Sequence, residues 1–136
     1  MKKVFLNLTV HPLLPEQREA AKRELGVQEF LEAGDVLPPE IVQKLRQCPS
    51  DPLELTMLAY AVAGFIVGYA TSKKVHVFVH LPAGSPAFMW AFADVFPNAY
   101  ATPVFSHSSR ESIEERLPDG TVRKRSVFKF ERFIVF

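Results

Sequence analysis

The chain has 136 residues, of which 48% are hydrophobic and 23% are charged, and its formal net charge is +1. These values are typical of one globular domain spanning residues 1–136, and they exclude a disordered chain. A net charge this close to zero also excludes a polycation that coats long nucleic acids, so any electrostatic attraction must be local. A single cysteine, Cys48, excludes an intrachain disulfide and a thiolate metal cluster.

The first 50 residues alternate between strand-like and helix-like patterns. Residues 3–10 are rich in β-branched and aromatic side chains and predict a strand. A helix is expected to begin at Pro15 and to end just before Gly26. Residues 27–33 predict a second strand, and residues 39–47 a short helix that Pro49 closes.

Residues 53–72 predict a helix that is apolar on nearly every side. Such a helix is expected to be buried on more than one face, against a sheet and a second chain. Gly64 and Gly68 lie four residues apart, which favours tight packing on the sheet, with a dimer seam as the alternative. The apolar stretch 57–70 is shorter than the roughly 20 residues that span a bilayer, so we expect a cytoplasmic protein without a membrane segment.

The C-terminal half continues the alternation and ends in a hairpin. Residues 75–81 predict a strand, and Ser85 and Pro86 predict the cap and the first position of a helix over 87–96. Residues 101–109 predict a fourth strand, and Asp119-Gly120 predicts the turn of a hairpin covering about residues 102–136. The order of elements predicts an α/β fold, with a mainly parallel sheet, flanking helices and a C-terminal β-hairpin.

Three polar segments lie after or near predicted strands and are expected to converge, because ligands of open parallel sheets bind beyond the carboxyl ends of the strands. Their residues are Thr9 and His11, then Ala83, Gly84 and Ser85, then Ser106, His107 and Ser108. Hydroxyls, imidazoles and amides before a helix suit an anion such as a phosphate, although the Gly-Ser-Pro stretch also fits an ordinary helix cap. These segments contain no carboxylate, and the chain has no metalloprotease, phosphate-loop or dinucleotide motif. We therefore predict neither a metal site nor a cofactor.

Two further sets of residues have a functional and a structural interpretation. The last predicted strand interleaves Arg123, Lys124, Arg125 and Arg132 with phenylalanines, a pattern that can bind phosphates and stack bases. The same pattern also fits the solvated face of an edge ribbon. His76 and His80 share one side of a strand and are interpreted as strand histidines rather than ligands.

Two stretches of the sequence resemble a known family. They are VFLNLTVHPLLPEQREAAKRELGVQEF near the start and LPDGTVRKRSVFKFERF near the end, about a third of the chain together. Both resemble the small CRISPR-associated ring nucleases found beside type III systems. The resemblance implies a Rossmann-like fold similar to CARF domains (the sensor domains of these systems) and a homodimer. It also implies a cyclic oligoadenylate as the ligand, and cyclic tetra-adenylate is the ring size we expect.

The resemblance also implies an activity and residue roles. Ring nucleases of this kind cleave the messenger without a metal, because each ribose 2′-hydroxyl attacks the neighbouring phosphodiester and leaves a 2′,3′-cyclic phosphate. His11 matches the early family histidine, and with Ser85 is the expected catalytic pair. Gly84 and Ser85 stand where these folds hold a phosphate, and Arg123, Lys124 and Arg132 match basic hairpin positions. Phe130 departs from the pattern, which has a histidine there. The alternatives are a non-catalytic protein that sequesters the same messenger, and a regulatory or scaffolding domain with no nucleotide ligand.

Overall fold

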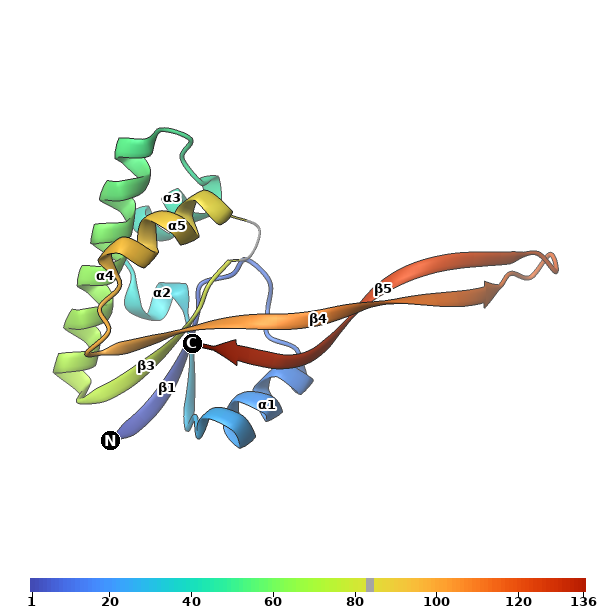
Figure 1. Cartoon of the computed structure of the whole chain (residues 1–136), viewed down its shortest axis with the longest axis horizontal. Coiled ribbons are helices and arrows are strands. Elements are labelled where there is room, and N and C mark those ends of the chain that lie inside the picture. Colours follow the sequence, from blue (N-terminus) through green and yellow to red (C-terminus); the bar gives the residue numbers. More distant parts are fainter. Residues whose placement is uncertain (83–84) are drawn as a thin grey trace.

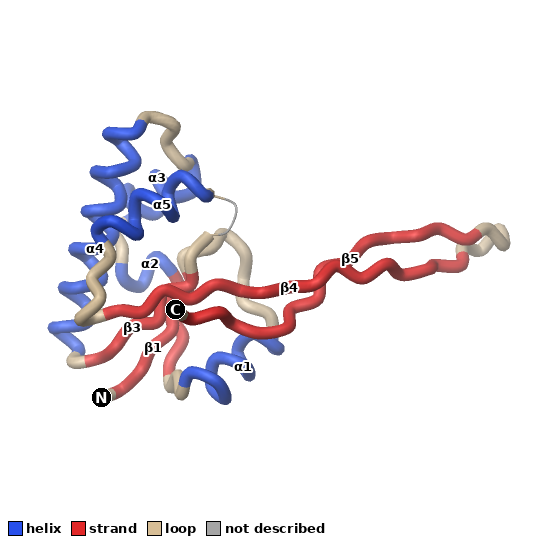
Figure 2. Tube along the Cα trace, in the orientation of Figure 1, coloured by secondary structure: helices blue, strands red, loops and turns tan. Residues whose placement is uncertain are grey.

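The computed structural model describes residues 1–82 and 85–136, and these form a five-stranded sheet flanked by helices (Figures 1 and 2). The strands are β1 (Lys2–Asn7), β2 (Glu29–Glu32), β3 (Val75–His80), β4 (Ala101–Arg116) and β5 (Val122–Val135). The helices are α1 (Pro15–Leu25), α2 (Ala33–Val36), α3 (Pro39–Gln47), α4 (Pro52–Lys73) and α5 (Pro86–Val95). The predicted α/β class and the flanking helices are confirmed.

The sheet is mixed, and not mainly parallel as predicted. Its order is β2-β1-β3-β4-β5, with parallel pairing from β2 to β4 and an antiparallel pairing between β4 and β5. The antiparallel pairing extends from Val104↔Val135 to Arg116↔Val122 and makes a long arm that leaves the body of the protein (Figure 1). The sequence prediction ended the fourth strand near residue 109. The stretch after it is polar and has no buried face, so its sequence lacks the alternation of apolar and polar residues that indicates a strand. Cross-strand pairing forms the strand there instead.

Alternate residues of the strands face two hydrophobic clusters. Val4 and Leu6 of β1 face the larger cluster, which α4 and α5 cover, whereas Phe5 faces a smaller cluster beneath α1. The period of two in side-chain direction produces this division. The α1 helix therefore lies on one face of the sheet and the other helices lie on the opposite face (Figure 1). By the same period, Asn7 and His80, described below, lie on the α1 face with Phe5 and Phe78.

Helix α4 is the long apolar helix of the prediction, but its surroundings differ. Seven of its residues are buried, among them Leu58, Val62 and Ile66, whereas Met57 and Tyr60 are more than 60% exposed. Within this chain it is therefore buried on one side only. A Cβ atom built on Gly64 or Gly68 meets no atom within 4 Å, so the predicted tight packing of these glycines on the sheet is wrong.

By length and composition alone, α4 could cross a membrane, since it has 22 residues and a mean hydropathy of 1.6. The helix is longer than the apolar stretch 57–70 considered in the sequence. It packs through its buried residues onto the sheet and α5, and the molecule looks like a soluble α/β domain.

Strand β1 is shorter than predicted because Asn7 ends it. The Asn7 side-chain oxygen accepts a hydrogen bond from the backbone N–H of Thr9, at 3.1 Å, which bends the chain after the strand. Helix α2 was not predicted, since its four residues are too few to show a helical period. Both features place polar atoms at the same edge of the sheet.

Candidate functional site

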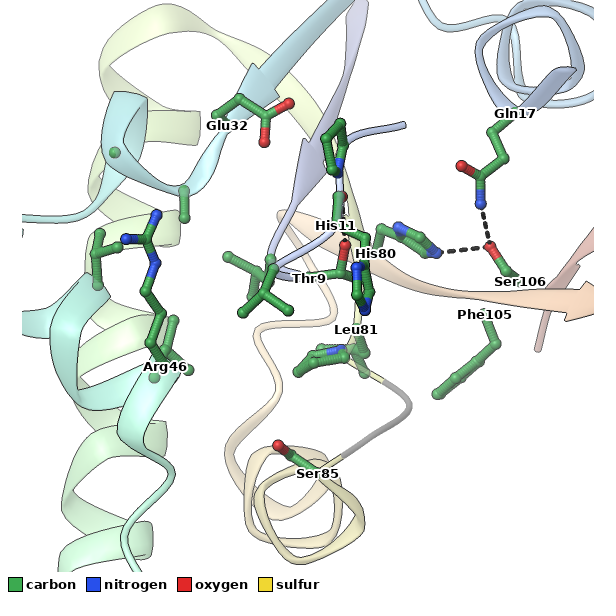
Figure 3. A pocket seen from close by; sticks show the side chains of 18 of the residues that line it. Thr9, His11, Gln17, Glu32, Arg46, His80, Leu81, Ser85, Phe105 and Ser106 are labelled. Atoms are coloured by element: carbon green, nitrogen blue, oxygen red, sulfur yellow. Dashed lines mark hydrogen bonds between the residues drawn. The ribbon is translucent and has the colours of Figure 1, made fainter. Parts of the chain in front are cut away.

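A cavity of about 970 Å³ opens beyond the carboxyl ends of the parallel strands (Figure 3). Its lining comes from the chain after β1, from α1, α2, α3, the chain after β3, and β4 with β5. The volume is within the range of small-molecule sites, and the position is the one that open α/β sheets use. Leu8, Leu81, Val42 and Leu45 supply apolar wall, and Phe105 and Phe128 supply aromatic rings.

Five of the site residues expected from the sequence line this cavity. They are Thr9, His11, Ser85, Ser106 and Ser108. The expected convergence of the strand-end segments therefore holds for these positions. Ala83 and Gly84, which were expected to hold a phosphate, lie outside the described residues.

Ser85 occupies the cap position before α5, with Pro86 at the first turn, as predicted. Its side chain makes no capping hydrogen bond, although capping was one expected role of this residue. The hydroxyl lines the cavity instead (Figure 3). Replacement of Ser85 therefore removes no helix cap, which makes it a clean position for testing a ligand contact.

The basic residues of the hairpin are not brought to the cavity of their own chain. Arg123, Lys124 and Arg125 lie near the far end of the arm (Figure 1), where their register partners on β4 are Glu115, Glu114 and Ile113. Arg123 is paired with Glu115 at 2.8 Å, and Lys124 lies across from Glu114. Cross-strand ion pairs of this kind fit the edge-ribbon interpretation.

His107 and Arg132 are also outside the cavity lining. They are register partners on β4 and β5, and both are exposed. His107 Nε2 lies 3.6 Å from a carboxylate oxygen of Glu131, so its ring is directed to that side chain rather than to the cavity.

The cavity includes charged and polar residues that sequence reasoning missed. Arg46 of α3, Glu32 at the end of β2 and Gln17 of α1 come from segments that were assigned no function. Arg46 forms no ion pair with the part of the chain that the structure describes, and is thus a cation available to a ligand. Glu32 places a carboxylate on a site that was expected to have none.

Asn7 and His80, also missed, are the two buried polar residues among those described. They are the last residues of β1 and β3 and are partners in the parallel register. Each follows a buried apolar strand, and a polar residue at that position is the signal that could have identified them. His80 was interpreted as a strand histidine, and it does lie in a strand, as the last residue of β3. That interpretation missed that His80 also lines the cavity.

His80 is 5% exposed, and its ring packs between Phe5 and Phe133, at centroid distances of 5.5 and 5.7 Å. Burial lowers the pKa of His80 from 6.5 to about 4, because the charged imidazolium loses its hydration there. The imidazole is therefore neutral at pH 7. Burial also lowers the pKa of His76, with a smaller contribution from Lys3, and His76 bonds Thr102 away from the cavity.

The fold and the cavity define an α/β protein with a cavity beyond the ends of its parallel strands. More specifically, the chain belongs to the Uncharacterized protein MJ1673 family, whose model matches residues 3–134. No curated protein and no solved structure matches the chain. The family description gives no activity, so the resemblance to ring nucleases stays a prediction.

Proposed function

We propose that the protein binds a cyclic oligoadenylate in this cavity and linearises it, as a ring nuclease of type III CRISPR signalling in the cytoplasm. One observation carries the proposal. His11, Ser85 and Ser106, which are distant in sequence, line one cavity that also contains the guanidinium of Arg46. A polyanionic sugar-phosphate needs this combination of hydroxyls, imidazole and guanidinium.

The ligand's parts have matching groups on the cavity wall. Arg46 and Ser85 suit a phosphate, which Glu32 repels from its own side of the cavity. The rings of Phe105 and Phe128 suit adenine, because bases stack on aromatic side chains regardless of sequence. The apolar wall excludes water from the same space.

The proposed reaction needs alignment more than a strong nucleophile. The ribose 2′-oxygen attacks the adjacent phosphorus in line with the leaving 5′-oxygen, and the products are a 2′,3′-cyclic phosphate and a free 5′-hydroxyl. The protein holds the reacting atoms in line and stabilises the extra negative charge of the transition state. We assign that stabilisation to Ser85 and Arg46, and assign to His11 the protonation of the leaving oxygen.

A single-turnover assay with labelled cyclic oligoadenylates of several ring sizes, in the presence of a chelator, tests the proposal. The expected product is a linear oligoadenylate with a 2′,3′-cyclic phosphate end. His11→Ala should slow cleavage by roughly 10²-fold or more, as expected for loss of a general acid. His107→Ala is the matched control, because that exposed histidine lies outside the cavity lining, and it should cleave within about twofold of the parent.

Two results separate the rival functions. Tight binding without linear product, even with protein in excess, would support the sequestering protein. The absence of a thermal shift with every ring size would exclude both forms of the proposal.

The proposal includes a homodimer, since the basic far end of the arm lies away from the cavity of its own chain, whereas Ser106 and Phe128, nearer the body, line that cavity. Arg123, Lys124 and Arg125 can contact the ligand only if the arm reaches the cavity of a second copy. Ligand contacts by these three residues therefore depend on the dimer, whereas those of His11, Ser85 and Arg46 do not.

A further inference from the structure

Asn7, His80 and Ser106 form a continuous chain of hydrogen bonds at the cavity wall. Asn7 Oδ1 lies 3.1 Å from His80 Nδ1, and His80 Nε2 lies 2.7 Å from Ser106 Oγ. Gln17 reaches the same hydroxyl from α1, with its Nε2 atom at 3.1 Å (Figure 3). The ends of β1 and β3, together with helix α1, thus fix the position of a single serine of β4.

The backbone determines where the protons of this chain lie. The N–H of Thr9 donates to Asn7 Oδ1, and Asn7 Nδ2 donates to the carbonyl oxygen of His11 at 2.9 Å. The Asn7 amide therefore has one orientation, and its oxygen faces His80. The Thr9 hydroxyl lies 2.7 Å from the same oxygen and 2.9 Å from the His11 carbonyl, and has one proton for the two. Because a bare ring nitrogen would repel an accepting oxygen at 3.1 Å, the neutral His80 ring carries its proton on Nδ1. Its Nε2 atom is then a bare acceptor.

This tautomer fixes the state of Ser106. The Ser106 hydroxyl must donate its only proton to His80 Nε2. Gln17 Oε1 accepts the N–H of Leu14 at 2.8 Å, so Gln17 Nε2 is the atom that donates to Ser106. One lone pair of Ser106 Oγ is left, and it is the only part of the hydroxyl that can bond with a molecule in the cavity.

No neighbouring charge disturbs this arrangement among the described residues. The side chains around the His80 ring are Phe5, Asn7, Ser106 and Phe133, from β1, β4 and β5, and none of them titrates in the neutral range. The titratable or charged groups of the cavity itself are His11, Glu32 and Arg46. Glu32 accepts from Asn7 Nδ2 at 3.4 Å and so supports the amide orientation rather than contacting the ring.

We propose that Ser106 is a hydrogen-bond acceptor that binds a hydroxyl of the ligand and relays its proton to His80. This inference rests on the proposed function, since the hydroxyl is then the attacking ribose 2′-hydroxyl. As the 2′-oxygen bonds to phosphorus, its proton moves to Ser106 Oγ and the Ser106 proton moves to His80 Nε2. The phosphorus–5′-oxygen bond breaks, and the leaving oxygen takes a proton from His11 or water. The His80 proton then returns to solvent.

The roles within the chain differ. Ser106 contacts the ligand and is the catalytic residue, whereas His80 and Asn7 are positioning residues that act through it. A phosphate oxygen is an acceptor like Ser106 Oγ, so this serine selects against a phosphate at its position. Ser106 was expected from the sequence to bind an anion, and the proposal reassigns it to the sugar.

The tautomer is tested by ¹⁵N NMR of the histidine side chains of the free protein. At pH 7, the His80 Nδ1 signal should be that of a protonated nitrogen and the Nε2 signal that of a bare one. The ring should stay neutral until the pH approaches 4. A proton on Nε2, or a doubly protonated ring at pH 7, would free the Ser106 proton to donate and would overturn the proposal.

The ligand contact is tested by binding of a cyclic oligoadenylate and of its 2′-deoxy form. The parent protein should bind the hydroxyl form about threefold to tenfold more tightly, the usual range for one hydrogen bond. Ser106→Ala should remove this preference and slow cleavage, whereas Ser112→Ala, an exposed serine of the arm, should retain both. His80→Gln should slow cleavage and abolish the loss of rate between pH 5 and pH 4.

The failures are distinguishable. If neither the cyclic oligoadenylate nor its 2′-deoxy form binds, the proposed function is wrong. The NMR result alone then decides whether the Ser106 hydroxyl is an acceptor. If the rings bind and are cleaved but Ser106→Ala keeps its preference and rate, the relay is wrong and the ring nuclease stands.

Discussion

His80 makes the stability of the protein depend on pH. Its pKa is lowered from 6.5 to about 4 in the folded state, so between these values the unfolded chain binds more protons than the folded one. Stability is therefore lost as the pH falls from 6.5 toward 4 and is constant, for this group, above and below that window. From pH 7 to pH 5, His80 should cost about 2 kcal/mol of folding free energy.

Urea denaturation at pH 7 and pH 5 measures this effect. His80→Gln, which cannot titrate, should lose less stability than the parent between the two pH values. His107→Gln is the control, since this histidine is exposed, and it should show the same pH dependence as the parent. Equal losses in the parent and in His80→Gln would mean that His80 titrates normally in the folded protein.

Residue types alone predicted part of the site. The hydroxyls of Thr9, Ser85 and Ser106 and the ring of His11 follow predicted strands or precede a predicted helix, and the strand-end rule brought them together. The contact between Asn7 and His80 was not predicted, because it depends on the parallel register of their strands, which no local sequence pattern reveals. Arg46 and Glu32 were not predicted as cavity residues, because the positions of their elements depend on tertiary packing.

At the scale of the elements, Gly64 and Gly68 offer a test of the exposed side of α4. Both lie inside the helix, and an added Cβ meets no atom within 4 Å. Gly64→Ala should therefore raise the free energy of unfolding by about 1 kcal/mol, through helix propensity. Chemical denaturation of the two proteins measures the change. A loss of stability, or of oligomeric mass, would show instead that this glycine packs closely against a second copy.

Most elements were predictable, and their ends were less so. Pro15, Pro39 and Pro86 mark the helix starts, and Gly26 ends α1 with a positive φ of 70°. The Asp119-Gly120 turn formed as predicted, with Gly120 at a φ of 86°, which glycine adopts without strain. The length of β4 and the pairing of the basic residues of β5 with β4 carboxylates depend on cross-strand register. The basic pattern alone therefore overstated the positive charge of the hairpin.

At the scale of the whole molecule, the arm formed by β4 and β5 decides how many chains make one site. The arm extends beyond the body, and its far end lies away from the described part of the body (Figure 2). Val122 and Ile113 are 55% and 38% exposed on it, which is apolar area that a second copy would cover. We therefore expect the protein to be a homodimer in solution, with the basic end of each arm near the cavity of its partner.

Light scattering of the purified protein and ligand titrations of Lys124→Ala at several salt concentrations test this arrangement together. A dimer whose arms reach the ligand should lose affinity on Lys124→Ala, and the slope of log affinity against log salt should become shallower by up to about one. Lys44→Ala, on the exposed side of α3 and outside the cavity lining, is the matched control and should leave the slope unchanged. A monomer that binds the ligand equally well with and without Lys124 would remove the arm from the site. The cavity residues His11, Ser85 and Arg46 would then have to hold the ligand within one chain, because the ion pairs of the arm would serve only its own folding.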